Sequence, residues 1–227
     1  MTKPLIRLVL AISIDGRIAP PLGGKAHLGN EGDREVLEEA LTWSDATLMG
    51  AGSLRAHQST CLIKKPSFIK DRLSKGKSKQ PISIIVSNKI IYSAKWLFFQ
   101  QPITRWLITN ENDSNKLSAF KGYERLINAN KWEEALENIY TLGIKKIALL
   151  GGAILAESFL KEDLIDELQL TIVPKILGGE NTLIKSSSNY LNKNLDQDNA
   201  WVLNEYKVLS NNEIMIKYYR NNLNTHN

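Results

Sequence analysis

The segment KIALLGGAILAESFL, residues 146–160, decides the fold class. Its first part is a short apolar run typical of a buried strand, and its second part places apolar residues at helical spacing. Two glycines, Gly151 and Gly152, join the two parts without an intervening loop. A strand that passes directly into a helix is the unit from which parallel α/β sheets are built. The segment therefore predicts an α/β protein.

Similar apolar runs on both sides of this segment predict further strands. We expect them at 5–14, 46–49, 82–86, 106–109, 124–128, 146–150 and 167–173. A helix should follow the N-cap residue Asn30, and further helices should cover 132–142, with Gly143 as C-cap, and 154–160. Residues 57–80 show little periodicity. Alternating strands and helices predict a mostly parallel central sheet with helices on both faces.

The end of the chain has a different pattern. Residues 201–210 and 213–219 are joined by Asn211-Asn212 and predict a closing antiparallel hairpin, which places an antiparallel strand at one edge of the sheet. No linker marks a second domain, so we expect a single domain over residues 1–220. The polar stretch 221–227 is predicted to be a disordered tail.

Composition limits the possible functions. The net charge is +5, and residues 64–79 hold seven Lys or Arg with one acid, Asp71. Such a run is typical of a solvated loop, or it can attract anionic substrates such as phosphates. Neither zinc-finger spacing nor interleaved aromatic and basic residues accompany it, so nucleic-acid binding ranks last.

Cysteine and histidine usage narrows the class further. The single cysteine, Cys61, cannot form an internal disulfide, which fits a reducing compartment. With three histidines the chain has too few ligands for a dedicated zinc site, so no metal is expected. The N-terminal apolar run is too short to span a bilayer and precedes no cleavage-site pattern. We expect a cytoplasmic protein without membrane association.

Glycine-lined junctions follow two of the predicted strands, where ligands of open α/β sheets bind. At Gly151-Gly152 the backbone can approach a ligand closely, and the helix dipole attracts an anion. The second junction, ATLMGAGSLRA at 46–56, offers Ser53 as helix cap and phosphate donor and Arg55 as positive charge. Each is also compatible with turn geometry alone, and neither matches the GxGxxG or Walker pattern. Together they suit a dinucleotide.

The end of the first strand carries a third polar group, SIDGR at 13–17. A hydroxyl from Ser13 and a carboxylate from Asp15 would face a cleft beside the sheet. The alternative is a strand-terminating Asp-Gly turn without a chemical role.

Four segments, in this order, resemble the reductase domain of the bacterial riboflavin-biosynthesis enzyme that is usually fused to a deaminase. They are AISIDGRIA at 11–19, SDATLMGAGSLRA at 44–56, LLGGAILAESFL at 149–160 and LIDELQLTIVPKILGG at 164–179. That domain is similar in fold to dihydrofolate reductase. No PCxxC zinc signature occurs in the sequence, so the resemblance implies a free-standing reductase.

The resemblance also implies a reaction. NADPH would reduce the ribosyl group of 5-amino-6-(5-phosphoribosylamino)uracil to the ribityl form, mainly by positioning donor and acceptor. It implies that Asp15 is the catalytic residue. The residues that it implies for substrate binding are Ser13, Asp15, Arg55 and His57. Residues implied for the cofactor are Gly50, Ala51, Gly52, Ser53, Ser87, Gly151, Gly152, Ala153 and Ile154. Because family members are commonly dimers, a homodimer is expected.

The sequence departs from the family pattern at three places. His57-Gln58-Ser59 replaces an Asp-Asn-Pro or Asp-Asp-Pro segment, Leu150 replaces a glutamate, and residues 26–30 replace a Ser-x-Trp-Ile-Thr pattern. His57 could supply a proton or contact phosphate, or it could be an exposed loop residue. A different pteridine-like or imine substrate, and a non-catalytic nucleotide-binding homologue, remain as alternatives.

Overall fold

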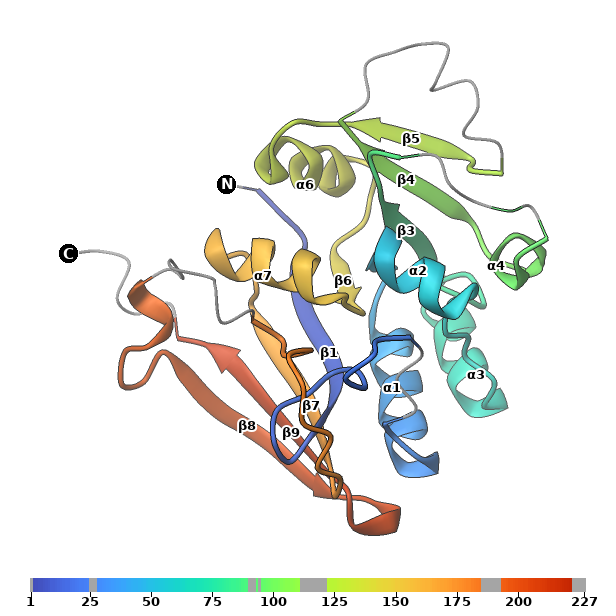
Figure 1. Cartoon of the computed structure of the whole chain (residues 1–227). Helices are drawn as coiled ribbons and strands as arrows, with labels where there is room; N and C mark the ends of the chain where they lie inside the picture. The colour runs from blue at the N-terminus through green and yellow to red at the C-terminus, as the bar shows by residue number, and fades with distance from the viewer. Residues whose placement is uncertain are drawn as a thin grey trace. The chain divides into compact units, whose positions relative to one another are not determined.

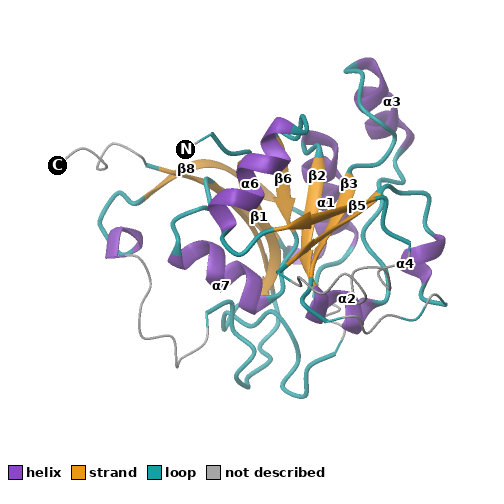
Figure 2. Ribbon diagram, turned by 90° about the horizontal axis from the view of Figure 1, so that it is seen from above, coloured by secondary structure: helices purple, strands orange, loops and turns teal. Residues whose placement is uncertain are grey.

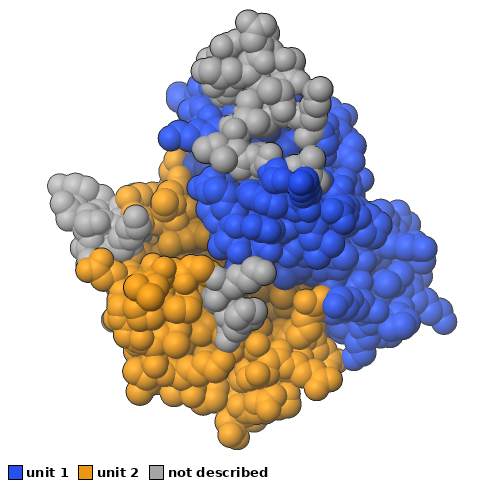
Figure 3. Space-filling view, turned by 45° about the vertical axis from the view of Figure 1, so that its right-hand side comes forward, with its two compact units in different colours: residues 1–4, 38–148 blue, residues 5–37, 149–227 orange. Residues whose placement is uncertain are grey.

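The computed structural model describes residues 2–24, 28–89, 93, 95–110, 122–184 and 193–221. It divides into two compact units, coloured in Figure 3. Unit 1 consists of residues 1–4 and 38–148, and unit 2 of residues 5–37 and 149–227. The segment 25–27 and the predicted tail beyond residue 221 lie outside the described residues.

Unit 1 is built on parallel strands in the order β5-β4-β3-β2-β6. Their bounds are β2 Ala46–Gly50, β3 Ile82–Val86, β4 Arg105–Thr109, β5 Arg125–Asn128 and β6 Lys146–Leu149. Helix α1 spans Glu31–Trp43, and its C-terminal part, from Glu38, belongs to unit 1. The other helices of unit 1 are α2 Ala51–His57, α3 Pro66–Ser74, α4 Leu97–Gln100 and α6 Trp132–Thr141 (Figure 1). The parallel pairs β2–β3, β3–β4 and β4–β5 confirm the mostly parallel sheet expected from the alternating pattern.

The core of unit 1 joins its strands to α2 and α4. Met49, Leu54, Phe98 and Leu107 are buried in one hydrophobic cluster. Phe98 and Phe99 meet edge to face with ring centroids 5.1 Å apart, a favourable aromatic geometry. This packing fixes α2 at the carboxyl end of β2.

Unit 2 is built on strands in the order β1-β7-β9-β8. Their bounds are β1 Leu5–Ser13, β7 Glu167–Val173, β8 Trp201–Val208 and β9 Ile214–Arg220, and they are accompanied by helix α7 Ala153–Lys161 and by short turns of 3-10 helix at Lys193–Leu195 and Ser210–Asn212. β1 and β7 are parallel, whereas β9 pairs antiparallel with both β7 and β8. The predicted hairpin and its edge position are therefore confirmed. Figure 2 distinguishes the strands from the helices and loops.

The two faces of the unit 2 sheet differ in chemistry. Directly paired residues point to the same side of a sheet, and three rows across β1, β7, β9 and β8 are entirely apolar. The rows are Leu8-Leu168-Tyr218-Leu203, Leu10-Leu170-Ile216-Tyr206 and Ile12-Ile172-Ile214-Val208. The opposite face is mostly polar and includes Gln169, whose amide donates to the Val36 carbonyl of α1 at 2.9 Å. We call the first of these the apolar face.

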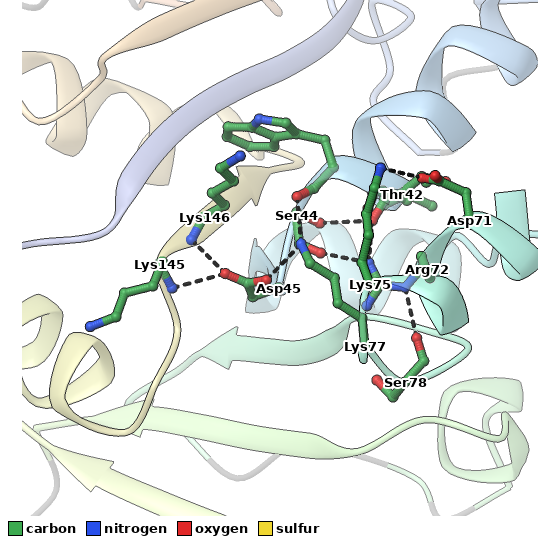
Figure 4. Close-up of polar contacts among 12 residues, drawn as sticks. Thr42, Ser44, Asp45, Asp71, Arg72, Lys75, Lys77, Ser78, Lys145 and Lys146 are labelled. Atoms are coloured by element: carbon green, nitrogen blue, oxygen red, sulfur yellow. Dashed lines mark hydrogen bonds and ion pairs between the residues drawn. The ribbon is translucent and has the colours of Figure 1, made fainter.

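A network of cations closes the end of α1 in unit 1 (Figure 4). The Arg72 guanidinium is 1% exposed and donates to the carbonyls of Leu41 at 2.8 Å, Thr42 at 3.2 Å and Ser44 at 2.6 Å. Lys77 Nζ lies 2.7 Å from Asp45 Oδ1. Carbonyls at a helix C-terminus lack partners within the helix and favour positive charge. The basic segment therefore caps α1.

Several details of the sequence interpretation were wrong. Residues 57–80 contain α3, which carries no apolar stripe because it contacts the unit through Arg72. Much of the basic run is exposed, as a solvated segment would be, but Arg72 is buried. The C-cap of α6 is Leu142, and Gly143 follows it at a φ of 92°.

Among the described residues no helix is both long and apolar enough to cross a membrane.

Candidate functional site

The Gly151-Gly152 junction lies in unit 2 between β6 and α7. Gly152 is the N-cap of α7, and no side chain caps this helix start. Gly151 is buried at a φ of 89°, where a Cβ atom would lie 3.1 Å from Leu10 Cδ2. Only glycine adopts such a conformation at little cost. No side chain therefore competes with an anion for the first N–H groups of α7, which the sequence analysis assigned to a phosphate.

The second junction lies in unit 1, where β2 passes directly into α2. Ser53 was expected to cap this helix and does not, because Gly50 is the N-cap and the helix begins at Ala51. Small residues allow the helix to start at the strand end without an intervening turn. Gly52 is exposed, and among the described residues a Cβ on it would meet Arg55 Nη2 alone, at 4.0 Å.

Ser87 follows β3, next to this junction in unit 1, because Val86 pairs with Gly50. Its hydroxyl donates to the Lys89 carbonyl at 2.8 Å and accepts from the Lys89 amide at 3.2 Å. The side chain therefore stabilises the turn after β3. A phosphate contact at this position would come most directly from the exposed Lys89 side chain.

Ser13 and Asp15 are brought together in unit 2. The buried Ser13 hydroxyl donates to Asp15 Oδ1 at 2.5 Å. The same carboxylate accepts the amide of Leu177 at 3.1 Å and that of Gly178 at 2.7 Å. Asp15 thereby ties the loop after β1 to the loop after β7. We call these two connected loops, residues 14–24 and 174–184, the loop clasp.

These hydrogen bonds favour the charged form of Asp15. The Ser13 hydroxyl, followed by the amides of Gly178 and Leu177, lowers the pKa of the Asp15 carboxyl to about 2. The stabilisation is complete above the ordinary aspartate pKa and is lost as the pH falls toward 2. Asp15 is therefore a carboxylate at neutral pH and cannot act there as a proton donor.

Backbone contacts reinforce the loop clasp. The Ile14 amide donates to the Lys175 carbonyl and the Ile18 amide to the Asn181 carbonyl, both at 2.9 Å. Arg17 and Thr182 form an antiparallel bridge. The two loops consequently behave as one structural element at the carboxyl ends of β1 and β7.

A second carboxyl in unit 2 was not singled out from the sequence as a functional residue. Asp33, in the first turn of α1, is hydrogen-bonded to the side chain of Thr171, on the polar face of β7. Its backbone amide donates to Glu213 Oε2 at 3.2 Å. Burial, with a further contribution from the Glu213 charge, raises the pKa of Asp33 above its usual value. The only sequence signal was its place three residues after Asn30.

The remaining predicted residues lie on α2 in unit 1. Arg55 is exposed, and half-buried His57 ends the helix just before Gln58, which adopts a φ of 55°. Thus Gly50–Ser53, Arg55, His57 and Ser87 belong to unit 1, whereas Ser13, Asp15 and Gly151–Ile154 belong to unit 2. Among the described residues no group of three potential ligands could hold a metal ion.

Comparison with known proteins places these features in a family. The family model of the RibD C-terminal domain matches residues 4–208. A 2,5-diamino-6-ribosylamino-4(3H)-pyrimidinone 5′-phosphate reductase of Archaeoglobus fulgidus is 21% identical over 79% of this chain and 84% of its own. A pyrimidine reductase-like protein of Corynebacterium diphtheriae superposes with a TM-score of 0.79 at 21% identity, covering 96% of this chain and 92% of that one. Dihydrofolate reductase of Enterococcus faecalis superposes with a TM-score of 0.50 at 12% identity, covering 96% of each chain.

Proposed function

Since this chain belongs to the RibD C-terminal domain family, we propose that it reduces the ribosyl group of 5-amino-6-(5-phosphoribosylamino)uracil with NADPH. The match over residues 4–208 carries the proposal. The Archaeoglobus relative is named for the 2-amino counterpart of this pyrimidine, so the substituent at C2 is the point to test. A biosynthetic reaction of this kind belongs in the cytoplasm.

The two glycine junctions fit the cofactor. The start of α7 presents uncapped N–H groups beside Gly151 and Gly152, which suits a pyrophosphate. The backbone from Gly50 to Ser53 is assigned to another part of NADPH, supported by its open surface at Gly52. When bound, NADPH supplies hydride to C1′ of the substrate. The chain itself binds, orients and excludes water.

A substrate panel tests the proposed function. We expect NADPH to bind in calorimetry and to be oxidised when the uracil ribosylamine phosphate or its 2-amino counterpart is added. Comparing the two turnover rates identifies the C2 substituent. Absence of NADPH binding would refute the proposal, whereas turnover of only an unrelated imine would keep the cofactor and change the substrate.

We predict that Asp15→Asn lowers turnover about 100-fold, because a small displacement of a positioning group is that costly. The new amide group would face the Gly178 amide, donor against donor, and loosen the loop clasp. NADPH affinity should stay within about threefold, since Asp15 is not among the residues that we assign to the cofactor. Stopped-flow turnover and calorimetric titration measure the two quantities separately.

Glu180→Gln is the matched control, because Glu180 is an exposed acid of the same loop. It should leave both quantities unchanged. Equal losses of turnover and NADPH affinity in Asp15→Asn would contradict the assignment of Asp15 to the substrate side.

We also propose a homodimer through the apolar face. Its β8 edge is open, with Tyr206 68% and Val208 75% exposed. Large exposed apolar surfaces mark interaction sites. A second copy supplies an apolar surface of the same size, related by a two-fold axis.

Sedimentation tests this assignment. The wild type should sediment as a dimer, and a Tyr206→Glu, Val208→Glu double variant as a 25.6 kDa monomer. Tyr219→Glu is the control, because Tyr219 is 44% exposed on the opposite face of β9 and should leave the dimer intact. A wild type that sediments as a monomer excludes this homodimer.

A further inference from the structure

Reduction of an imine needs a proton as well as a hydride. When hydride adds to C1′, the electron pair of the C=N bond moves to nitrogen, which must then be protonated. Asp15 is a poor source, because its oxygens already accept three hydrogen bonds in the loop clasp. Leu150, beside the glycine junction, offers no acid.

We propose that Asp33 is the catalytic residue that donates this proton, with Thr171 as the positioning residue that orients it. The inference rests on the proposed function. Thr171 pairs with Ala11 on β1, two residues before Ser13, so Asp33 approaches the same polar face that ends in Ser13. The side chain is half-buried, which leaves it open to substrate and to proton recovery from solvent.

The surroundings of Asp33 hold its carboxyl in place. Fully buried Glu213 accepts the Asp33 amide with one oxygen and the Asn30 amide with the other. A Cβ on Gly29 would lie 1.9 Å from Asp33 Oδ2, so the carboxyl occupies the space that only a glycine leaves free. The side chain is therefore seated over the start of α1.

The same surroundings favour protonation. Burial raises the pKa of Asp33 most, and the negative charge of Glu213 adds to the effect. The Thr171 hydrogen bond and the charge of Arg34, the next residue on α1, act in the opposite direction. Lys175 of the loop clasp donates to the Leu28 carbonyl at 3.0 Å. A carboxyl whose pKa is raised toward the working pH is suited to general acid catalysis.

The step balances in atoms and electrons. The imine carbon gains hydride, NADPH is oxidised by two electrons to NADP⁺, and the nitrogen gains the proton of the Asp33 carboxyl. The resulting carboxylate accepts a hydrogen bond from the Thr171 hydroxyl and regains a proton from water before the next turnover.

The pH dependence of single-turnover hydride transfer tests the proposal. Wild-type rates should fall as the pH rises through the Asp33 pKa. Asp33→Asn should abolish this pH dependence and lower the rate at least about 100-fold, with NADPH affinity retained. Asp33→Glu should restore part of the rate. Thr171→Val should raise the apparent pKa of the pH–rate profile by roughly one unit, because it removes a hydrogen bond to the charged form of Asp33. Thr47→Val, at another buried strand threonine, is the control and should leave this apparent pKa unchanged.

A second measurement does not depend on turnover. A carboxyl ¹³C NMR titration of the cofactor-free protein should show Asp33 titrating above the usual aspartate range, and higher still in Thr171→Val. Two results would overturn the assignment of Asp33 and leave the proposed function standing. One is a rate that still falls with rising pH in Asp33→Asn, and the other is an Asp33 carboxyl that titrates at or below the usual aspartate value. A wild type that binds NADPH but reduces neither pyrimidine would refute the proposed function, and proton donation with it.

Discussion

Arg72→Met should lower the free energy of unfolding by about 3–5 kcal/mol, because each buried carbonyl left without a donor costs about 1–3 kcal/mol. The variant keeps an unbranched apolar stem but removes the guanidinium, which leaves four carbonyls without their donor, those of Leu41, Thr42, Ser44 and Ser78. Most single-domain proteins are stable by about 5–15 kcal/mol, so the loss is a large fraction. Urea unfolding followed by circular dichroism measures it.

Lys75→Met provides the matched control three residues along. Lys75 pairs with Asp71 at 2.7 Å, but the two side chains are 60% and 40% exposed. Exposed pairs contribute less than about 1 kcal/mol. If the two variants lost similar stability, burial at the end of α1 would not be the cause, and the structural role given to Arg72 would be wrong.

Gly152→Val should weaken NADPH binding at least about 100-fold while the protein stays folded. The backbone of Gly152, at φ −74° and ψ 178°, is extended, so the change adds volume at dihedral angles that residues other than glycine adopt. That volume lies at the helix start assigned to the pyrophosphate, where N–H groups must reach the anion directly. Calorimetric titration with NADPH measures the affinity, and thermal unfolding reports the fold.

Two further variants sharpen this experiment. Gly152→Ala adds a single methyl group and should give an intermediate affinity. Lys161→Ala, at the other end of α7, removes an ion pair with Glu157 and should leave NADPH binding as it is. An undiminished affinity in Gly152→Val would remove the pyrophosphate from this junction and require a different cofactor site.

Local patterns in the sequence located the elements well. The alternation in ELQLTIV matched β7 at Glu167–Val173, and the run ISIIV matched β3 at Ile82–Val86. In both cases turn-forming or polar residues end an apolar run, which is a signal contained within a few residues. The mistaken cap at Ser53 shows the limit of such signals, because glycine and alanine let α2 begin three residues earlier, with Gly50 as its N-cap.

Contacts between distant residues could not be predicted in this way. Glu213 binds the Asp33 amide across 180 positions, so the start of α1 is held by a residue that no nearby motif indicates. Arg72 looked like one cation among seven until its burial was known. Asp33 and Asp15 are both acidic in sequence, yet hydrogen bonding lowers the pKa of one and burial raises that of the other.

The division of unit 2 between the two ends of the chain affects how the protein can be made. β1 leaves the ribosome before β7, its parallel neighbour, which begins at Glu167, and before β9, which ends at Arg220. Until those residues are synthesised, the apolar segment LIRLVLAIS has no strand of its own unit to pair with. Unit 1, nearly continuous from residue 38 to 148, can form first. Nascent chains stalled before β6, which begins at Lys146, should therefore bind chaperones through the strand LIRLVLAIS.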